Sequence, residues 1–393
     1  MKRLNYHIIR KVKIVFVTVF LLSLSLPIID WITPISLSTE YDATENRALA
    51  KRPKLTLNNI TEFPNKFEEY FNDNMNFRED LLQINALLGI KKIDKKSHAF
   101  VHQGSEGWCY VQKYIKAYEN KEVFSKNQLD SLKQMFVERG TWLKKRGIKS
   151  YVAIIPTKAY IYPEYLPSYI FQFQRLSRTN QFLEMLSEND DIKGIDLSES
   201  LLKAKKEYPE YPLFYKTDQH WNKFGALVGL KQIMDTIRKD FPEFSEIDIN
   251  NYNITKEKIE GKQMAEILKK KKQLSDLEIT VIPKIPDSTK IIQRYNYQKY
   301  QPHPKFPYPG EFVINYLSNN KNPKILLIRD SFSNALRSKF KEGCGLGDIV
   351  LIWDNWCYRL NENITEKENP KIHLTLLIDG NLEFVLTHSP DKK

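Results

Sequence analysis

The stretch Ile325-Leu-Leu-Ile-Arg-Asp-Ser-Phe332, followed by Ser333-Asn-Ala-Leu-Arg-Ser-Lys-Phe340, decides how the rest of the chain is organised. Four consecutive apolar residues predict a buried strand, and the following segment predicts a helix that ends near Gly343. Ser331 then lies in a tight turn between strand and helix, beside the N–H groups of the helix N-terminus. This setting is typical of a serine nucleophile, and the alternative is a simple N-cap, which Asp and Ser both favour.

A second polar cluster lies earlier, in Phe214-Tyr-Lys-Thr-Asp-Gln-His-Trp-Asn-Lys-Phe-Gly-Ala226. Asp218 and His220 are two positions apart, so on an extended segment both side chains leave the same face. A carboxylate placed there holds the imidazole in one tautomer, as a general-base histidine requires. A hydrogen-bonded core histidine is the alternative. Taken together, the two segments predict a catalytic triad of Ser331 as nucleophile, His220 as base and Asp218 as the orienting carboxylate.

The same two blocks carry a family resemblance. The block Lys216–Ala226 resembles the Asp-x-His-Trp signature of SGNH-hydrolase-like proteins of the alginate acetylation type, a group that includes the DHHW proteins. Arg329-Asp-Ser-Phe332 is similar to their Gly-Asp-Ser or Gly-Thr-Ser nucleophile block, which follows the histidine block in this permuted subgroup. Gln219 replaces the first His of the four-letter motif, and Arg329 replaces the usual Gly. Weaker matches are Glu45-Asn-Arg47 with Leu49 and Pro53, Gly104 to Trp108, and Ile155-Pro-Thr-Lys158 with Tyr162-Pro163, so the resemblance runs from about Glu45 to Glu383.

The resemblance implies O-acetyl transfer to a cell-surface or exported polysaccharide through a transient acyl-serine, without a cofactor or metal. It also implies a multi-spanning membrane O-acyltransferase as the partner that supplies the acyl group. We expect the backbone amides of Ser331 and its neighbour to stabilise the oxyanion. Two alternatives stay open: an SGNH-type carbohydrate esterase, which uses the same triad with water as acceptor, and a non-catalytic glycan-binding scaffold.

Three further residues are predicted to contact the substrate. Lys158 follows a predicted strand at the end where open α/β sheets place ligand-contacting residues, and a solvated loop lysine is the alternative. Trp221 belongs to the histidine block, and Arg329 lies directly before the nucleophile turn.

Composition restricts the class of partner. The 393 residues carry a formal net charge of +12, and 41% are hydrophobic, enough to build a substantial core. A positive charge suits an anionic partner such as phospholipid head groups, an acidic polysaccharide or teichoic acid. No nucleic-acid-binding module is recognisable, so we expect no nucleic acid. The three cysteines, Cys109, Cys344 and Cys357, have no metal-ligand spacing, although Cys344 and Cys357 are able to pair outside the cell.

The N-terminus has the pattern of an export signal. Several basic residues precede an apolar run from Ile14 to Ile29, which Trp31 extends towards a membrane interface. The run is short compared with the ~20 residues of a full membrane span. Ser36-Leu37-Ser38 offers a poor cleavage site, so we expect an uncleaved single-pass signal anchor with the remaining chain outside the cytoplasm.

The predicted organisation has three parts: residues 1–38 as basic flank and anchor, 39–120 as juxtamembrane linker and N-terminal part, and 121–393 as the catalytic domain. The fold class is α/β, with a central mostly parallel sheet and helices on both faces. An insertion at about 242–320, which contains the run Lys269–Lys272, separates the two catalytic blocks. The predicted helices are 65–92, 128–146, 180–186 and 226–241, and a hairpin is predicted at 101–111. Strands are predicted at 151–155, 277–285, 291–300, 349–353 and 374–378, and a short strand or turn at 192–197.

Overall fold

The computed structural model describes most of the chain after residue 100 and short pieces before it. The described residues are 14, 17, 18, 20, 21, 25, 52–54, 56, 63–74, 101–285, 290–296, 298–302, 306, 308–342, 344–354 and 358–387. The chain divides into two compact units, Met1–His98 and Ala99–Lys393. Residues 99–120, which the sequence assigns to the N-terminal part, therefore lie in the larger unit.

The first unit contains helix α2 (Phe63–Asn74), which overlaps the start of the predicted helix 65–92. Residues 75–92 of that prediction lie outside the described residues. So does the predicted anchor, except for six positions between residues 14 and 25. Where the chain is described, no helix combines the length and apolar character needed to cross a membrane.

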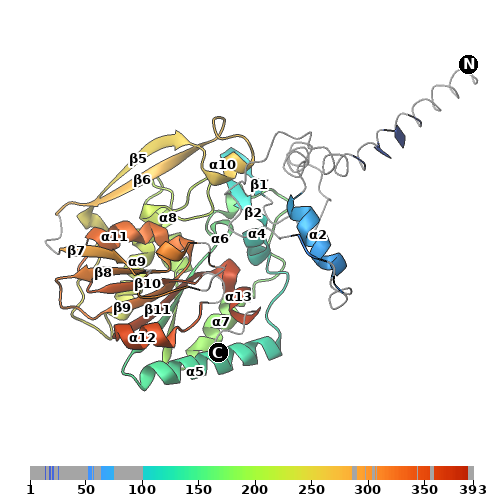
Figure 1. Ribbon diagram of the computed structural model, residues 1–393. Helices are drawn as coiled ribbons and strands as arrows, with labels where there is room; N and C mark the ends of the chain where they lie inside the picture. Colours follow the sequence, from blue (N-terminus) through green and yellow to red (C-terminus); the bar gives the residue numbers. More distant parts are fainter. Residues whose placement is uncertain are drawn as a thin grey trace, which may run out of the picture. The chain divides into compact units, whose positions relative to one another are not determined.

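A seven-stranded mixed sheet forms the centre of the larger unit (Figure 1). The strand order is β4-β3-β11-β9-β10-β8-β7; the pairs from β4 to β10 are parallel, and β10–β8 and β8–β7 are antiparallel. The strands are β3 (Lys149–Ile155), β4 (Ile192–Asp196), β7 (Ile291–Tyr295), β8 (Val313–Ser318), β9 (Ile325–Arg329), β10 (Ile349–Trp353) and β11 (Ile372–Ile378). The predicted α/β class is confirmed, and each of the five parallel strands was predicted.

The predicted insertion at 242–320 is wrong in its second half. Strands β7 and β8 lie in that range but extend the central sheet, since β8 pairs with β10 and β7 pairs with β8. Four consecutive residues of β8, Val313 to Tyr316, are buried. Only the first half is a separate element, a two-stranded antiparallel ribbon of β5 (Tyr252–Glu260) and β6 (Ser275–Pro283) joined through α10 (Gln263–Ile267). We call residues 252–283 the arm. Lys269–Lys272 lies in its connection after α10, not on a helix face.

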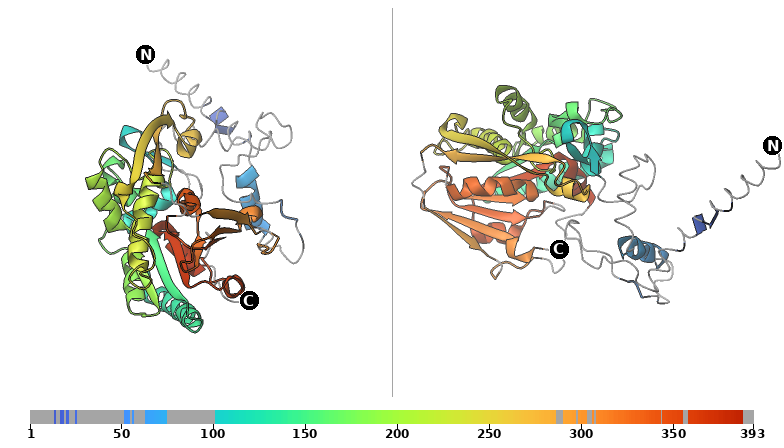
Figure 2. Two further views of the ribbon diagram at one scale, coloured as in Figure 1. Left: turned by 90° about the vertical axis from the view of Figure 1, so that its left-hand side faces the viewer. Right: turned by 90° about the horizontal axis from the view of Figure 1, so that it is seen from above.

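Helices cover both faces of the sheet (Figure 2). Alternate residues of β3 enter different cores: Tyr151, Ala153 and Ile155 pack with α8 and α9, whereas Val152 and Ile154 pack with α5, α7 and α12. This alternation explains why the strand is apolar on both faces. The helices are α4 (Gln112–Glu119), α5 (Lys126–Lys144), α6 (Lys158–Ile161), α7 (Arg178–Ser187), α8 (Ser198–Glu207), α9 (Lys223–Ile237), α11 (Arg337–Glu342), α12 (Glu362–Glu368) and α13 (Leu382–Thr387).

Two smaller predictions have different outcomes. The hairpin is confirmed as β1 (Val101–Gln103) and β2 (Cys109–Val111), with the 3₁₀ turn η2 (Ser105–Gly107) between them. The pairing of Cys344 with Cys357 stays a prediction, because Cys357 lies outside the described residues; the Cys344 sulfur is 3.5 Å from the Tyr252 hydroxyl.

The loops that follow the parallel strands build the candidate site. Strand β9 runs into the 3₁₀ helix η6 (Ser331–Leu336), and β3 runs into α6. The histidine block immediately precedes α9, whose N-cap Asn222 accepts hydrogen bonds from the N–H groups of Phe224 and Gly225. The residues of both catalytic blocks thus lie at the N-termini of helices that pack against the sheet.

Gly225 should be irreplaceable even by alanine. A Cβ atom at this position would lie 2.2 Å from the carbonyl oxygen of Leu213. This is a backbone atom, which cannot move out of the way as a flexible side chain can. We expect Gly225→Ala to lower the free energy of unfolding by about 2 kcal/mol or more, within or above the usual cost of overpacking. Gly310→Ala is the matched control, since its Cβ meets nothing within 4 Å. Urea unfolding of both variants measures the difference, and equal stabilities would contradict the close approach.

Candidate active site

Ser331 lies in the strand-turn-helix setting that the sequence predicts. Asp330 caps η6: its Oδ1 accepts the N–H of Phe332 at 2.8 Å. The helix that follows is not continuous, since the 3₁₀ helix η6 precedes the α-helix α11. Because Asp330 supplies the cap, the Ser331 hydroxyl is left to face His220.

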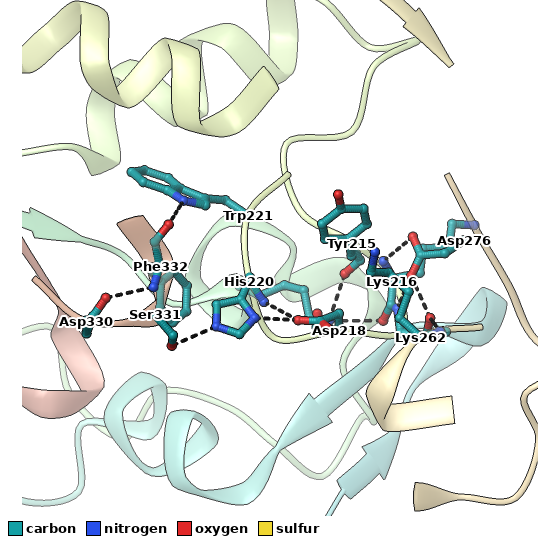
Figure 3. A network of polar contacts seen from close by, with 12 residues as sticks. Tyr215, Lys216, Asp218, His220, Trp221, Lys262, Asp276, Asp330, Ser331 and Phe332 are labelled. Atoms are coloured by element: carbon teal, nitrogen blue, oxygen red, sulfur yellow. Dashed lines mark hydrogen bonds and ion pairs between the residues drawn. The ribbon is translucent and has the colours of Figure 1, made fainter. Parts of the chain in front are cut away.

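The three predicted catalytic side chains form a continuous hydrogen-bonded chain (Figure 3). His220 Nε2 lies 2.9 Å from Ser331 Oγ, and His220 Nδ1 lies 2.7 Å from Asp218 Oδ1. A neutral imidazole in this position donates its Nδ1–H to the carboxylate and accepts the serine hydroxyl proton at Nε2. Both ring nitrogens therefore have the partners that a general base requires.

The backbone that carries Asp218 and His220 is not extended, so that part of the prediction is wrong. Residues 216–220 form a series of bends, closed by an isolated antiparallel bridge between Phe214 and Trp221. Asp218 Oδ1 accepts the backbone N–H of His220 at 2.9 Å as well as its ring N–H. An Asx-type turn thus brings the two side chains together, with the same two-residue spacing.

The charge of Asp218 is stabilised locally. Burial opposes its ionisation, but the hydrogen bonds and charge of His220, helped by the charge of Lys158, hold the pKa of Asp218 at about 2. The group is therefore an ionised carboxylate at neutral pH. An ionised partner at Nδ1 stabilises the imidazolium that forms when the histidine accepts a proton.

Lys158 lies where the sequence predicts, directly after β3, but it is not exposed to a substrate. Its side chain is buried, and Nζ donates to the carbonyl oxygens of Tyr215 at 3.0 Å, Lys216 at 3.0 Å and Asp218 at 2.8 Å. All three ammonium protons are used by the loop that carries the triad. Burial lowers the pKa of Lys158 to about 8.

Trp221 and Arg329 are also buried, so neither of these predicted substrate contacts is observed. Trp221 is fully buried, and its Nε1–H donates to the Phe332 carbonyl oxygen at 2.7 Å, which ties the histidine loop to the nucleophile turn. The Arg329 guanidinium lies 4.2 Å from the centre of the Trp353 ring and donates to Asn334 Oδ1 at 2.8 Å. Both side chains therefore stabilise the turn that carries Ser331 from the protein interior.

One of the two predicted oxyanion donors is already engaged. The N–H of Phe332, the neighbour of Ser331, donates to Asp330 Oδ1 at 2.8 Å. The Ser331 N–H stays a prediction as the backbone donor.

The sequence did not reveal the polar network beneath the nucleophile. Asp330 Oδ2 accepts the Tyr358 hydroxyl at 2.7 Å, and that hydroxyl accepts a hydrogen bond from Asn381 at 2.7 Å. Lys113 in turn donates to Asn381. Burial raises the pKa of Asp330. These residues come from separate parts of the chain with no motif spacing, so only the Asp-Ser pair itself was visible as a signal.

The fold and the site define an α/β protein of the SGNH-hydrolase-like class, with a serine, a histidine and an aspartate in hydrogen-bonded order. The chain belongs to the family described as "SGNH hydrolase-like domain, acetyltransferase AlgX", which residues 101–343 match. The predicted resemblance is therefore confirmed.

Individual proteins give more distant matches. A probable alginate O-acetylase AlgJ of Pseudomonas syringae pv. tomato is 29% identical over 139 residues, which are 35% of this chain and 34% of that protein. The probable alginate O-acetylase AlgJ of Pseudomonas aeruginosa is 27% identical over 138 residues, 35% of this chain and 32% of that protein. The chain thus spans about a third of the length of the curated relatives it matches. The structure of Bacillus cereus PatB1 shares the fold, with a TM-score of 0.50, 20% identity, and coverage of 72% of this chain and 97% of that one.

The depressed pKa of Asp218 predicts a pH-dependent contribution to stability. Its folded pKa of about 2 is below its ordinary value of 3.8, so the contribution is present above that value and is lost as the pH falls through the folded pKa. The difference corresponds to about 2 kcal/mol. We expect the destabilisation caused by Asp218→Asn to be fully present at about pH 5 and to shrink towards about pH 2.

Urea unfolding of wild type and variant across this pH range tests the prediction. Asp235→Asn is the control, because Asp235 pairs with Lys231 at the partly exposed surface of α9, where ion pairs contribute little. A difference between wild type and Asp218→Asn that does not change with pH would contradict the linkage.

Proposed function

We propose that the protein is an O-acetyltransferase that acts on a cell-surface or exported polysaccharide through an acyl-serine at Ser331. The observation that carries the proposal is the hydrogen-bonded order Ser331 Oγ, His220 Nε2, His220 Nδ1, Asp218 Oδ1, at 2.9 and 2.7 Å. Membership of a family described as acetyltransferases supports acetyl as the transferred group. The relatives described as probable alginate O-acetylases support a polysaccharide as the acceptor.

The geometry supports a two-step transfer. In the first step His220 Nε2 takes the hydroxyl proton while Ser331 Oγ attacks the acyl carbonyl of the donor, and the tetrahedral intermediate collapses as His220 protonates the leaving group. In the second step His220 takes a proton from a sugar hydroxyl, whose oxygen attacks the acyl-serine. Serine then leaves with that proton, and the acetyl ester remains on the sugar. Asp218 stabilises the imidazolium in both steps.

An esterase would use the same first half-reaction with water as the final acceptor. The measurement that separates the two is the fate of the acyl group in the presence of oligosaccharides. A non-catalytic scaffold is disfavoured because Arg329, which replaces the usual glycine before the nucleophile, leaves the catalytic hydrogen bonds in place: its side chain is fully buried beside Trp353, and Ser331 Oγ lies 2.9 Å from His220 Nε2.

The location and the partner belong to the same proposal. A basic flank followed by the apolar run Ile14–Ile29 supports an N-terminal membrane anchor with the catalytic unit outside the cytoplasm. A multi-spanning membrane O-acyltransferase would then pass the acyl group outward to Ser331.

Substitutions in the triad should separate chemistry from folding. We expect Ser331→Ala and His220→Ala each to reduce turnover of a chromogenic acetyl ester to near background, and the double variant to add little, because the two residues act as a unit. Asp218→Asn should reduce the rate on the order of 10⁴, since it leaves the imidazole in the wrong tautomer. Mass spectrometry should locate a trapped acyl or sulfonyl group on Ser331.

Ser338→Ala is the matched control, because this serine lies on α11 and its hydroxyl donates to the local Ala335 carbonyl at 3.4 Å. It should keep the wild-type rate. A folded Ser331→Ala protein with wild-type activity would end the acyl-serine mechanism. Release of acetyl to water at the same rate with and without candidate oligosaccharides would favour the esterase.

Membrane topology can be tested independently of activity. A reporter fused after Lys393 should be active only if it is a type that functions outside the cytoplasm, because the basic flank is retained on the cytoplasmic side. Cell fractionation should place the full-length chain with the membranes. Activity of a cytoplasmic reporter at this position would overturn the proposed location.

A further inference from the structure

The loop that carries Asp218 has few internal hydrogen bonds between backbone groups. Within it the Tyr215 N–H donates to the His220 carbonyl at 3.2 Å, and the His220 N–H donates to the Asp218 side chain at 2.9 Å. Buried backbone groups without partners are costly, so such a loop keeps one conformation only if other parts of the chain supply donors and acceptors. The residues that do so determine where Asp218 and His220 lie.

The carbonyl side of the loop is held by Lys158 and by the hairpin. Lys158 Nζ reaches three carbonyl oxygens, as described above, and the N–H of Cys109 on β2 also donates to the Lys216 carbonyl at 2.8 Å. These donors come from α6, which follows β3, and from the hairpin strand β2.

The amide side of the loop is held by a single carboxylate on the arm. Asp276 Oδ1 accepts the Lys216 N–H at 3.0 Å (Figure 3). Asp276 Oδ2 accepts the Thr217 N–H at 2.7 Å and the Thr217 hydroxyl at 2.6 Å. The side chain is 3% exposed and belongs to β6. A buried carboxylate with this many donors is a strong, directional anchor.

Two backbone groups of the arm complete the attachment at Thr217. The Lys262 N–H donates to Thr217 Oγ1 at 2.8 Å, and the Met264 N–H donates to the Thr217 carbonyl at 2.9 Å. Thr217 is directly followed by Asp218, so its position fixes the start of the Asx-type turn that presents Asp218 to His220.

We propose that Asp276 is a positioning residue for catalysis: with Lys158 on the opposite side, it clamps residues 215–218 so that Asp218 and His220 meet Ser331 in reactive geometry. The arm, which lies between the two catalytic blocks in sequence, therefore helps to set the geometry of the site. This inference rests on the proposed acyl transfer, because positioning has a catalytic consequence only if His220 acts as the base.

The variant Asp276→Asn tests the clamp. An amide keeps the size of the side chain, but its NH₂ group faces N–H or O–H donors where an oxygen accepted them. We expect kcat for a chromogenic acetyl ester to fall roughly 10- to 100-fold, with KM changed less than about 2-fold, since a misplacement of about 1 Å can cost 10²-fold in rate. Lys158→Met, which removes the other side of the clamp, should give the same split between kcat and KM.

Loss of stability alone must be separated from mispositioning. Ile279 is fully buried on the same strand and belongs to the main apolar core, so Ile279→Val or Ile279→Ala, whichever matches Asp276→Asn in urea unfolding, is the control. The control should keep the wild-type kcat. An equal fall in kcat for the control would overturn the positioning role, as would wild-type kinetics of a folded Asp276→Asn protein.

A second readout does not depend on turnover. The proton on His220 Nδ1, held by Asp218, should give a downfield proton resonance in the wild type, which Ile279→Val retains and Asp276→Asn loses or broadens. If Ser331→Ala leaves activity intact, the acyl-serine proposal fails, yet this resonance still reports whether Asp276 holds the loop. An unchanged resonance in Asp276→Asn would overturn the clamp.

Discussion

The structure around the site depends on one constraint: an irregular loop cannot supply hydrogen-bond partners for all of its own backbone groups. Residues 215–218 belong to no helix or strand, yet Asp218 must keep its carboxylate 2.7 Å from His220 Nδ1. Lys158 supplies positive donors to the carbonyl groups, and Asp276 supplies an anionic acceptor to the amides. Because each charged group can bind several backbone groups at once, two side chains replace the partners that a sheet would have provided.

The buried ammonium group of Lys158 has an energetic cost, and this cost explains why the loop keeps a single conformation. Placing an ammonium group in the interior costs several kcal/mol unless it is fully hydrogen-bonded, and burial does lower the pKa of Lys158 to about 8. The cost is offset only in the geometry where the three carbonyl oxygens and the nearby charges of Asp218 and Asp276 surround Nζ. Any displacement of the loop would leave an uncompensated charge, so the buried ions favour one loop conformation over its neighbours.

Much of the sheet was predictable because the parallel strands are apolar on both faces. Ile349–Trp353 was predicted with its observed bounds, and Ile325–Ile328 and Leu374–Ile378 were predicted within a few residues. The triad was also predictable, since Asp218 and His220 are close in sequence and Ser331 has a local setting. Strands β7 and β8 were not recognised as part of the sheet, because membership depends on partners distant in sequence. For the same reason Asp276 and Tyr358, which contact the loop and the nucleophile turn, gave no local signal.

Arg329 replaces the glycine of the family motif without disturbing the hydrogen bonds among Ser331, His220 and Asp218. A glycine at this position would carry no side chain, whereas the arginine side chain is fully buried, stacked 4.2 Å from the Trp353 ring centre on the neighbouring strand. Its Nη2 lies 3.7 Å from the Glu311 carboxylate, and its Nη1 reaches Asn334 within η6. Within the described residues its Nε and Nη2 have no hydrogen-bond partner, and burial lowers its pKa to about 10, so the charge is held at some cost. The benefit is local: by bonding Asn334, the guanidinium fixes η6 against β9, and the turn between them carries Ser331. The larger residue therefore supports the nucleophile from the core side and leaves the face towards His220 open.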